Sequence, residues 1–186
     1  MTSTGLTRQN LPVRDRTPVG YAAADGVARG GYVLSDGVGK DPDVLLVATG
    51  SEVQVALDAQ QLLAGDSIEA RVVSMPCREW FTQQALDYQD EVLPSHVRAR
   101  VSVEAAVGQR WREVVGDAGM VISLEHFGAS ADYQRLYTEF GITAEAVAQA
   151  ARDSLTQAGA GLDAIGPGGV QDTSAPDTGR TGDQPG

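Results

Sequence analysis

A continuous apolar run over residues 43–48 (DVLLVA) constrains the fold more than any other feature of the sequence. A strand with one solvated face alternates apolar and polar residues, whereas a strand covered on both faces reads as an unbroken apolar run. Thr49-Gly50 follows as a turn, and apolar residues then recur at helical spacing up to Gly65. We therefore expect a central strand, covered on both faces, that leads directly into a helix.

The same alternation of strand and helix patterns continues along the chain. Further strands are predicted over residues 31–34, 70–74, 98–103 and 120–124, the first of them at a sheet edge. Helices are predicted over residues 51–65, 78–83, 85–93, 105–115, 132–140 and 143–156, the first opened by a capping box of Ser51 and Gln54. Such alternation implies parallel strands joined by right-handed crossovers. The predicted fold class is α/β, a three-layer α/β/α sandwich around a mostly parallel sheet of about five strands.

Three segments are distinguished by composition. Residues 1–30 contain Pro12 and Pro18 and are expected to form an irregular lead-in between domains. Residues 31–157 form the predicted α/β domain. Residues 158–186 are rich in Gly, Pro and Asp and hold few large apolar side chains, so they cannot bury enough surface to offset the entropy of ordering. We expect this last segment to be a disordered tail.

The charge and the cysteine content exclude several classes of protein. The 186 residues carry a net charge of −11, which disfavours a nucleic-acid binder and a partner of anionic membranes. No apolar run is long enough to cross a bilayer, and the first residues lack the apolar core of a secretory signal. The single cysteine, Cys77, permits no internal disulfide. We therefore expect a cytoplasmic protein that binds neither nucleic acid nor membrane.

Two short motifs suggest chemistry, and each has a structural alternative. Residues 49–52 (TGSE) lie at a strand-to-helix junction where backbone N–H groups can hold an anion. However, residues 49–52 lack a Walker or dinucleotide-binding pattern. They also place the negative charge of Glu52 where a phosphate would lie, which favours a capping turn. Cys77 precedes Arg78, but the two histidines, His96 and His126, are distant in sequence, so a structural thiol is favoured over a nucleophile.

Two acidic residues close predicted strands, where α/β proteins often place functional groups. Glu104 and Glu125 could form a carboxylate pair at this edge, or they could be solvated or helix-capping acids. One cysteine and two scattered histidines provide no metal-ligand spacing. On chemistry alone, the residues predict an α/β domain without a catalytic constellation.

Short segments throughout the chain resemble transketolases, and they follow one another in that family's order. They are residues 6–12 (LTRQNLP), 30–34 (GGYVL), 48–53 (ATGSEV), 70–76 (ARVVSMP), Tyr88, 91–94 (EVLP), 103–105 (VEA), 127–130 (FGAS) and 140–143 (FGIT). Residues from about 6 to about 155 resemble the third, C-terminal domain of this family.

The resemblance implies a function that this chain does not perform alone. Transketolases are three-domain homodimers of the pentose phosphate pathway that transfer two-carbon ketol units between sugar phosphates, using thiamine diphosphate and a divalent metal, Mg or Ca. The family's first domain holds the cofactor, and its second supplies the activating glutamate. We therefore expect this chain to bind no cofactor and to be inactive in isolation. Its expected partners are the N-terminal and middle domains, on the same or a separate polypeptide, and sugar phosphates.

One site residue is carried over by the resemblance. Arg8, within residues 7–9 (TRQ), matches the family arginine that binds the phosphate of the sugar substrate. A guanidinium suits that role because its planar fork binds phosphate through two hydrogen bonds. Two alternatives remain: a non-catalytic module or gene remnant without a substrate, and an independent domain that binds a small molecule near Gly50, Glu104 and Glu125.

Overall fold

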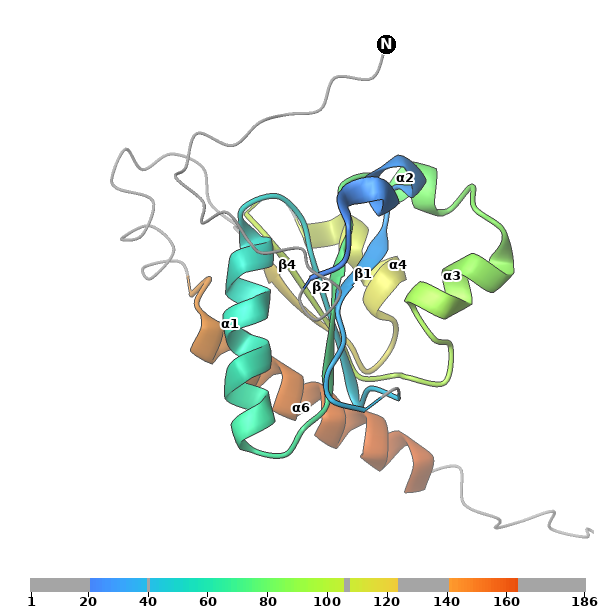
Figure 1. Cartoon of the computed structure of the whole chain (residues 1–186). Coiled ribbons are helices and arrows are strands. Elements are labelled where there is room, and N and C mark those ends of the chain that lie inside the picture. The colour runs from blue at the N-terminus through green and yellow to red at the C-terminus, as the bar shows by residue number, and fades with distance from the viewer. Residues whose placement is uncertain (1–20, 40, 106–107, 124–140, 164–186) are drawn as a thin grey trace, which may run out of the picture.

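The apolar run at residues 43–48 lies at the centre of the sheet, as predicted. In the computed structural model, which describes residues 21–39, 41–105, 108–123 and 141–163, it forms strand β2 (Val44–Ala48), and all five of its residues are buried (Figure 1). The prediction of a strand covered on both faces is therefore confirmed.

The sheet has five strands in the order β1-β3-β2-β4-β5. The strands other than β2 are β1 (Tyr32–Ser35), β3 (Ala70–Ser74), β4 (Arg100–Glu104) and β5 (Met120–Ser123). The pairs β2–β3, β2–β4 and β4–β5 are parallel, whereas β1 pairs antiparallel with β3 and lies at the edge. The predicted α/β fold, with a mostly parallel sheet and an edge strand at its start, is thus confirmed.

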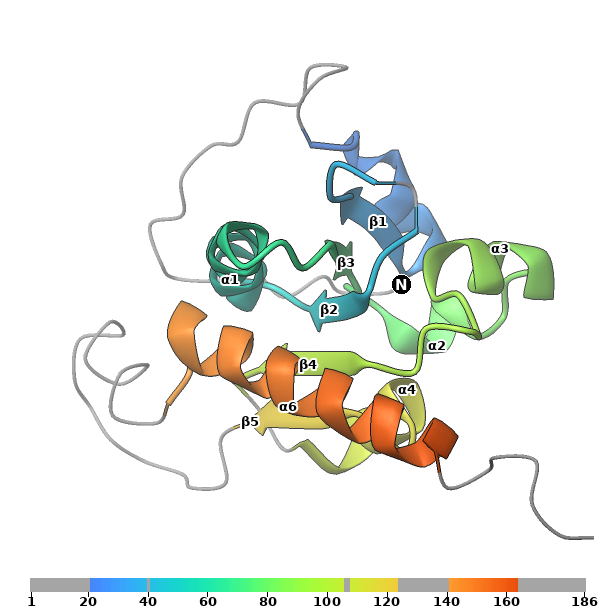
Figure 2. The same ribbon diagram turned by 90° about the horizontal axis from the view of Figure 1, so that it is seen from below.

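Helices cover both faces of the sheet, which completes the three layers. The helices are η1 (Ala24–Arg29), α1 (Glu52–Gly65), α2 (Arg78–Phe81), α3 (Leu86–Val92), η2 (Gly108–Trp111), α4 (Arg112–Val115) and α6 (Ala144–Asp163), where η marks a 3-10 helix. The long helices α1 and α6 lie together on one face (Figures 1 and 2). The short helices α2, α3, η2 and α4 lie on the other. Among the described residues, no helix is long and apolar enough to span a membrane.

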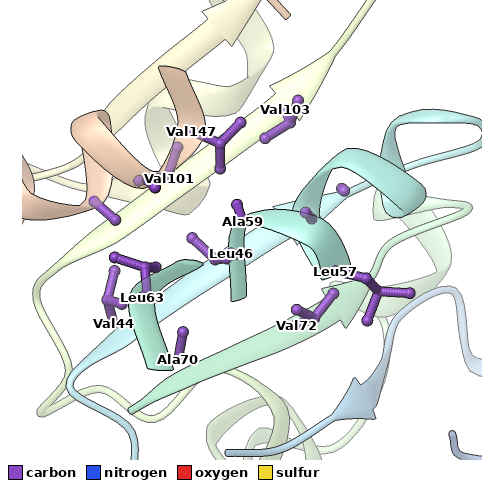
Figure 3. Close-up of a cluster of buried hydrophobic side chains, with 14 of the residues drawn as sticks. Val44, Leu46, Leu57, Ala59, Leu63, Ala70, Val72, Val101, Val103 and Val147 are labelled. Atoms are coloured by element: carbon purple, nitrogen blue, oxygen red, sulfur yellow. The ribbon is translucent and has the colours of Figure 1, made fainter. Parts of the chain in front are cut away.

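The face under α1 and α6 holds the larger hydrophobic core. Leu46 on β2 and Val101 on β4 are fully buried, and they pack with Leu63 of α1 and Val147 of α6 (Figure 3). Helix α1 contributes its apolar stripe because residues at helical spacing share one side of the helix. This core fixes both long helices on the sheet.

The opposite face holds a second, smaller core. Val47 of β2 and Val73 of β3 pack there against Phe81 of α2, Val92 of α3 and Trp111 of η2. The strands alternate their side chains between the two faces, so neighbouring valines on one strand enter different cores. The short helices reach this core with one or two side chains each.

The capping box predicted at the start of α1 does not form. Ser51 makes no side-chain capping hydrogen bond to α1, and its hydroxyl instead donates to Glu52 Oε1 at 3.0 Å, so the predicted capping box does not form. Gln54 donates to Asp58 Oδ1 at 2.6 Å, one turn further along the helix. Local side-chain pairs at i, i+1 and i, i+4 compete here with the backbone groups of the first turn.

Two predicted helices differ in type or length from the observed ones. The helix predicted over residues 105–115 is a 3-10 turn followed by a single α-helical turn, which ends at Gly116 with a positive φ of 75°. Helix α6 runs past the predicted domain boundary at residue 157 to Asp163, and Arg98 Nη1 donates to the carbonyl of Ala158 near its end. The lead-in includes η1. The predicted helix at residues 132–140 and most of the predicted tail lie outside the described residues.

Candidate functional site

The most defined candidate site is a cleft of about 210 Å³ at the carboxyl ends of the parallel strands. Thr49 after β2, Cys77 after β3 and Glu104 at the end of β4 all line it. Parallel strands place their carboxyl ends at one edge of the sheet, which is where open α/β sheets usually hold ligands. We name this hollow the strand-end cleft.

Glu104 is the predicted strand-end acid that the structure places in the strand-end cleft. Its Oε2 atom accepts a hydrogen bond from the indole N–H of Trp111, which is itself buried. Trp111 therefore combines a packing role in the smaller core with orientation of this carboxylate. The other predicted strand-end acid, Glu125, lies outside the described residues, so the predicted carboxylate pair stays a prediction.

Two arginines and a second acid complete the charged lining of the strand-end cleft. Arg110 Nη1 lies 3.3 Å from Glu79 Oε1, and Arg78 donates to the backbone carbonyl of Arg110. The pKa of Glu79 is lowered, chiefly by its backbone hydrogen bond; desolvation opposes this shift, and the charges of Arg78 and Arg110 add to it. With Glu104, the lining holds two carboxylates and two guanidinium groups, so its charges largely balance.

Cys77 lies in the strand-end cleft, and the described residues that line this cleft include no histidine. Its Sγ atom is 3.8 Å from Glu79 Oε2, so its polar neighbour is a carboxylate. His96 is exposed and pairs with Asp41 at 2.8 Å, and His126 lies outside the described residues. The structural interpretation of this thiol therefore stays a prediction.

The strand-to-helix turn at residues 49–52 contains a buried acidic residue, Glu52. Gly50 has a positive φ of 58°, which glycine adopts without strain, and Glu52 is buried at the first turn of α1. A buried carboxylate at a helix N-terminus is favoured by the helix dipole and occupies the region where an anion would be held. The turn therefore favours the structural interpretation over phosphate binding.

The remaining candidates can be placed only in part. Within the described ranges, no group of three or more His, Cys, Asp and Glu side chains could hold a metal ion. Arg8, the predicted phosphate-binding residue, lies outside those ranges and stays a prediction. Sequence reasoning missed Arg110 and Glu79 as members of the strand-end cleft. Their pairing spans 31 positions, and no local pattern signals it.

Comparison with known proteins identifies similar sequences and structures. The family model described as "Transketolase-like TK C-terminal domain" matches residues 30–143. Transketolase of Mycobacterium tuberculosis (strain H37Rv) is 58% identical over 154 residues, which are 81% of this chain and 21% of the relative. The chain thus spans about a fifth of the length of the curated relatives it matches.

Solved structures agree with this similarity. A Pichia stipitis transketolase in complex with sedoheptulose-7-phosphate superposes with a TM-score of 0.69 at 34% identity, over 80% of this chain and 20% of that one. A structure titled "Split gene transketolase, inactive beta4 tetramer" superposes with a TM-score of 0.55 at 26% identity, over 70% of this chain and 43% of that one.

Proposed function

The chain belongs to the family of transketolase-like C-terminal domains, and from this membership we propose that it works as the C-terminal domain of an assembled transketolase. In that role it contributes to domain packing, to the dimer and to contact with the substrate phosphate, while the other domains carry out two-carbon ketol transfer. The family match over residues 30–143 carries the proposal, because that range contains every described strand of the sheet. The expected cytoplasmic location remains a prediction of the same proposal.

The cofactor belongs to the other domains in this proposal. Thiamine diphosphate and a divalent metal supply the carbanion chemistry of ketol transfer when they are bound. The described residues of this chain do not fit either group: Glu52 stands at the N-terminus of α1, and the carboxylates of the strand-end cleft are engaged by Trp111 and Arg110. We therefore assign no chemical step to these residues.

The split-gene structure supports the expectation that such a domain needs partners. Its title describes an assembly that is inactive, and that assembly contains a chain with this fold. By analogy, we propose that the present chain becomes part of an active enzyme only when it associates with the N-terminal and middle domains of a transketolase. The association, and not chemistry within this chain, is then the property to test.

A complementation experiment tests the proposal. The full chain is co-expressed with M. tuberculosis transketolase from which the matching 154 residues have been removed, and ketol transfer from xylulose 5-phosphate to ribose 5-phosphate is measured. The relative's own C-terminal domain, supplied in the same way, is the positive control. We expect activity from the mixture and none from either part alone. A mixture that stays inactive while the control is active would refute the proposal.

The same assay tests the predicted role of Arg8. Removing a guanidinium that binds phosphate through charge-assisted hydrogen bonds is expected to raise the KM for the sugar phosphate roughly tenfold or more. The change Arg8→Ala should therefore raise KM much more than it lowers kcat, and Arg8→Lys should recover part of the loss. A KM that does not change in Arg8→Ala would remove the residue from the site. Stabilisation of the isolated chain by sugar phosphates would instead favour an independent ligand-binding domain.

A further inference from the structure

A second hollow, of about 390 Å³, lies on the sheet face that the short helices cover. Its lining includes Phe81 of α2, Leu86 of α3, Leu93 just after α3 and Val114 of α4. We name it the short-helix groove. Pockets that hold small molecules measure about 300–1,000 Å³ and combine an apolar lining with a few polar groups. The short-helix groove has the size and the apolar part of such a pocket.

Arg100 supplies a polar group to this groove. It is the first residue of β4, and the alternation of side chains along a strand places it on the opposite face from the buried Val101. Its guanidinium donates to the carbonyls of Pro94, Val97 and Val114 at 2.9 Å each, and the side chain lines the groove. These three bonds join the loop after α3 to α4 and hold the guanidinium in one place.

The three carbonyls leave the charge of Arg100 without a counter-ion. A guanidinium has five N–H groups, so two N–H groups of Arg100, one on Nη1 and one on Nη2, have no acceptor in the described part of the chain. Arg78, which also lines the groove, lies 3.9 Å from a carboxylate oxygen of Glu113. Arg110 of the strand-end cleft lies 3.3 Å from Glu79. Of the arginines that line either hollow, Arg100 is thus the one whose charge is not paired within the described ranges.

Burial makes this unpaired charge costly. Desolvation lowers the pKa of Arg100, and the charge of Asp90 opposes this shift. Both acids of the lining are exposed: the Glu113 side chain to 86%, and Asp90, whose Oδ1 atom already accepts from Ser95 N at 2.8 Å. Water and salt screen exposed charges, so these acids oppose an anion in the groove only weakly. An anion beside the guanidinium would be attracted more strongly, because it would lie away from bulk water.

We propose that the short-helix groove binds a small monocarboxylate with a compact apolar body. The carboxylate accepts hydrogen bonds from the unused N–H groups of Arg100, and such bonds are strong because both partners are charged. The apolar body lies against Phe81, Leu86 and Leu93. Leu86 is 79% exposed, and covering it removes apolar surface from water. The inference goes beyond the proposed function and does not depend on it, since this chain alone supplies the lining.

Titrations of the full chain, followed by NMR, test the inference with three probes. Phenylacetate carries both the charge and the apolar body, phenylacetamide has the body without the charge, and acetate has the charge without the body. We expect phenylacetate to bind with a Kd on the order of 1 mM or below. It should shift the backbone amide signals of the groove residues Thr82, Leu86, Gln89 and Val114. Phenylacetamide and acetate should each bind roughly tenfold more weakly, because each lacks one of the two contacts.

Three variants test the location and the charge of the site. Leu86→Glu places a carboxylate on the wall of the groove and should weaken phenylacetate binding roughly tenfold or more. Leu62→Glu is the matched control, since it makes the same change at a 42% exposed leucine of α1, on the other face, and should alter the Kd less than about twofold. Asp90→Asn removes a negative charge from the lining, keeps an acceptor for Ser95 N, and should tighten binding about twofold.

Four results would overturn the inference. Equal affinities for phenylacetate and phenylacetamide would show that Arg100 does not hold the ligand. Signal shifts confined to Thr49 and Glu104 would move the anion to the strand-end cleft. A Leu86→Glu chain that folds and binds like Leu62→Glu would exclude the groove. No shifts with phenylacetate at concentrations on the order of 10 mM would leave no site at all.

These measurements use this chain without a partner. Failure of the inference therefore leaves the proposed function standing, and failure of the complementation experiment leaves the inference standing.

Discussion

The two faces of the sheet are covered in different ways. On one face, α1 and α6 lie across the strands with long apolar stripes, and the core beneath them includes Leu46, Leu63 and Val147 (Figure 3). On the other face, α2, α3, η2 and α4 are short and cover a smaller core around Val47 and Val73. The strands are the same, so the difference comes from the crossover segments that connect them.

The difference separates a structural face from a face available for contacts. Long helices bury a continuous stripe against the sheet, whereas the short elements leave a hollow of about 390 Å³, the short-helix groove, whose lining includes Phe81, Leu86, Leu93 and Val114. Leu86 stays exposed there, while the leucines of α1 that face the sheet are buried. We therefore expect stability to depend mainly on the α1/α6 face and ligand binding mainly on the other.

The largest expected effect comes from deleting volume under the long helices. Leu46→Ala should lower the free energy of unfolding by about 3–5 kcal/mol, because a fully buried leucine leaves a cavity that two anchored helices cannot fill. Leu86→Ala, on the exposed wall of the short-helix groove, should change it by less than about 0.5 kcal/mol. Urea unfolding followed by tryptophan fluorescence measures both. Equal losses in the two variants would contradict the division between the faces.

Two neighbouring valines on β3 give a closer comparison. Val72 and Val73 are both fully buried, but Val72 belongs to the core under the long helices and Val73 to the smaller one. Val72→Ala should lower the free energy of unfolding by about 2–3 kcal/mol and Val73→Ala by about 1–2 kcal/mol. The second loss is smaller because the short helices can move into the cavity more easily than the long ones. Thermal and urea unfolding of the pair give the difference directly. A larger loss for Val73→Ala would reverse the assignment of the more rigid face.

Two buried serines distinguish the faces by their hydrogen bonds. Ser154 of α6 accepts from Arg100 N at 3.0 Å and donates to the carbonyl of Ala118 at 2.7 Å, whereas Ser102 Oγ on β4 is buried with no hydrogen-bond partner. Ser154→Ala should therefore cost about 1–2 kcal/mol, since it leaves buried backbone groups unpaired. Ser102→Ala should be neutral or stabilise by up to about 1 kcal/mol. A clear loss in Ser102→Ala would show that its hydroxyl has a partner in solution.

The sheet could be predicted from the sequence because its strands carry local signals. Residues 43–48 form an apolar run and residues 70–74 a strand-like segment, and the helical pattern between them predicts the parallel crossover that joins β2 to β3. The strand predicted over residues 31–34 at a sheet edge corresponds to β1. The short elements after β4 were predicted less well, since a 3-10 turn and one α-helical turn leave too few residues for a helical period to be recognised.

The candidate site could be predicted only where strand ends mark it. Glu104 was identified because it closes a strand, and the structure does place it in the strand-end cleft. The pairing of Arg110 with Glu79 joins residues far apart in sequence, so only the fold brings them together. The exposure of Leu86 was also invisible beforehand, because a single apolar residue in a short helix fits a buried position as well as an exposed one.

The smallest expected effect concerns the contact that holds the end of α6 to the fold, and this effect depends on pH. Arg98 binds the Ala158 carbonyl of α6 and also Asp117 Oδ2 at 2.6 Å. The pKa of Asp117 is lowered, chiefly by the hydrogen bond from Arg98; desolvation opposes this shift, and the charge of Arg98 adds to it. A carboxyl group whose pKa is lower in the folded than in the unfolded chain stabilises the fold at pH values above its unfolded pKa of about 3.9. This stabilisation is lost as the pH falls through the pKa of the folded state.

Asp117→Asn should therefore lower the melting temperature slightly at neutral pH, and its difference from wild type should shrink below about pH 4. The difference should also shrink in high salt, because the pair is exposed. Asp90→Asn serves as the comparison. The pKa of Asp90 is lowered mainly by the hydrogen bond from the Ser95 backbone N–H, and an asparagine oxygen can still accept this hydrogen bond. Asp90→Asn should thus lower the melting temperature less than Asp117→Asn does. If the Asp117→Asn difference widened in acid, the pair would not be what holds the end of α6, and the extra stability of that face would have to come from packing alone.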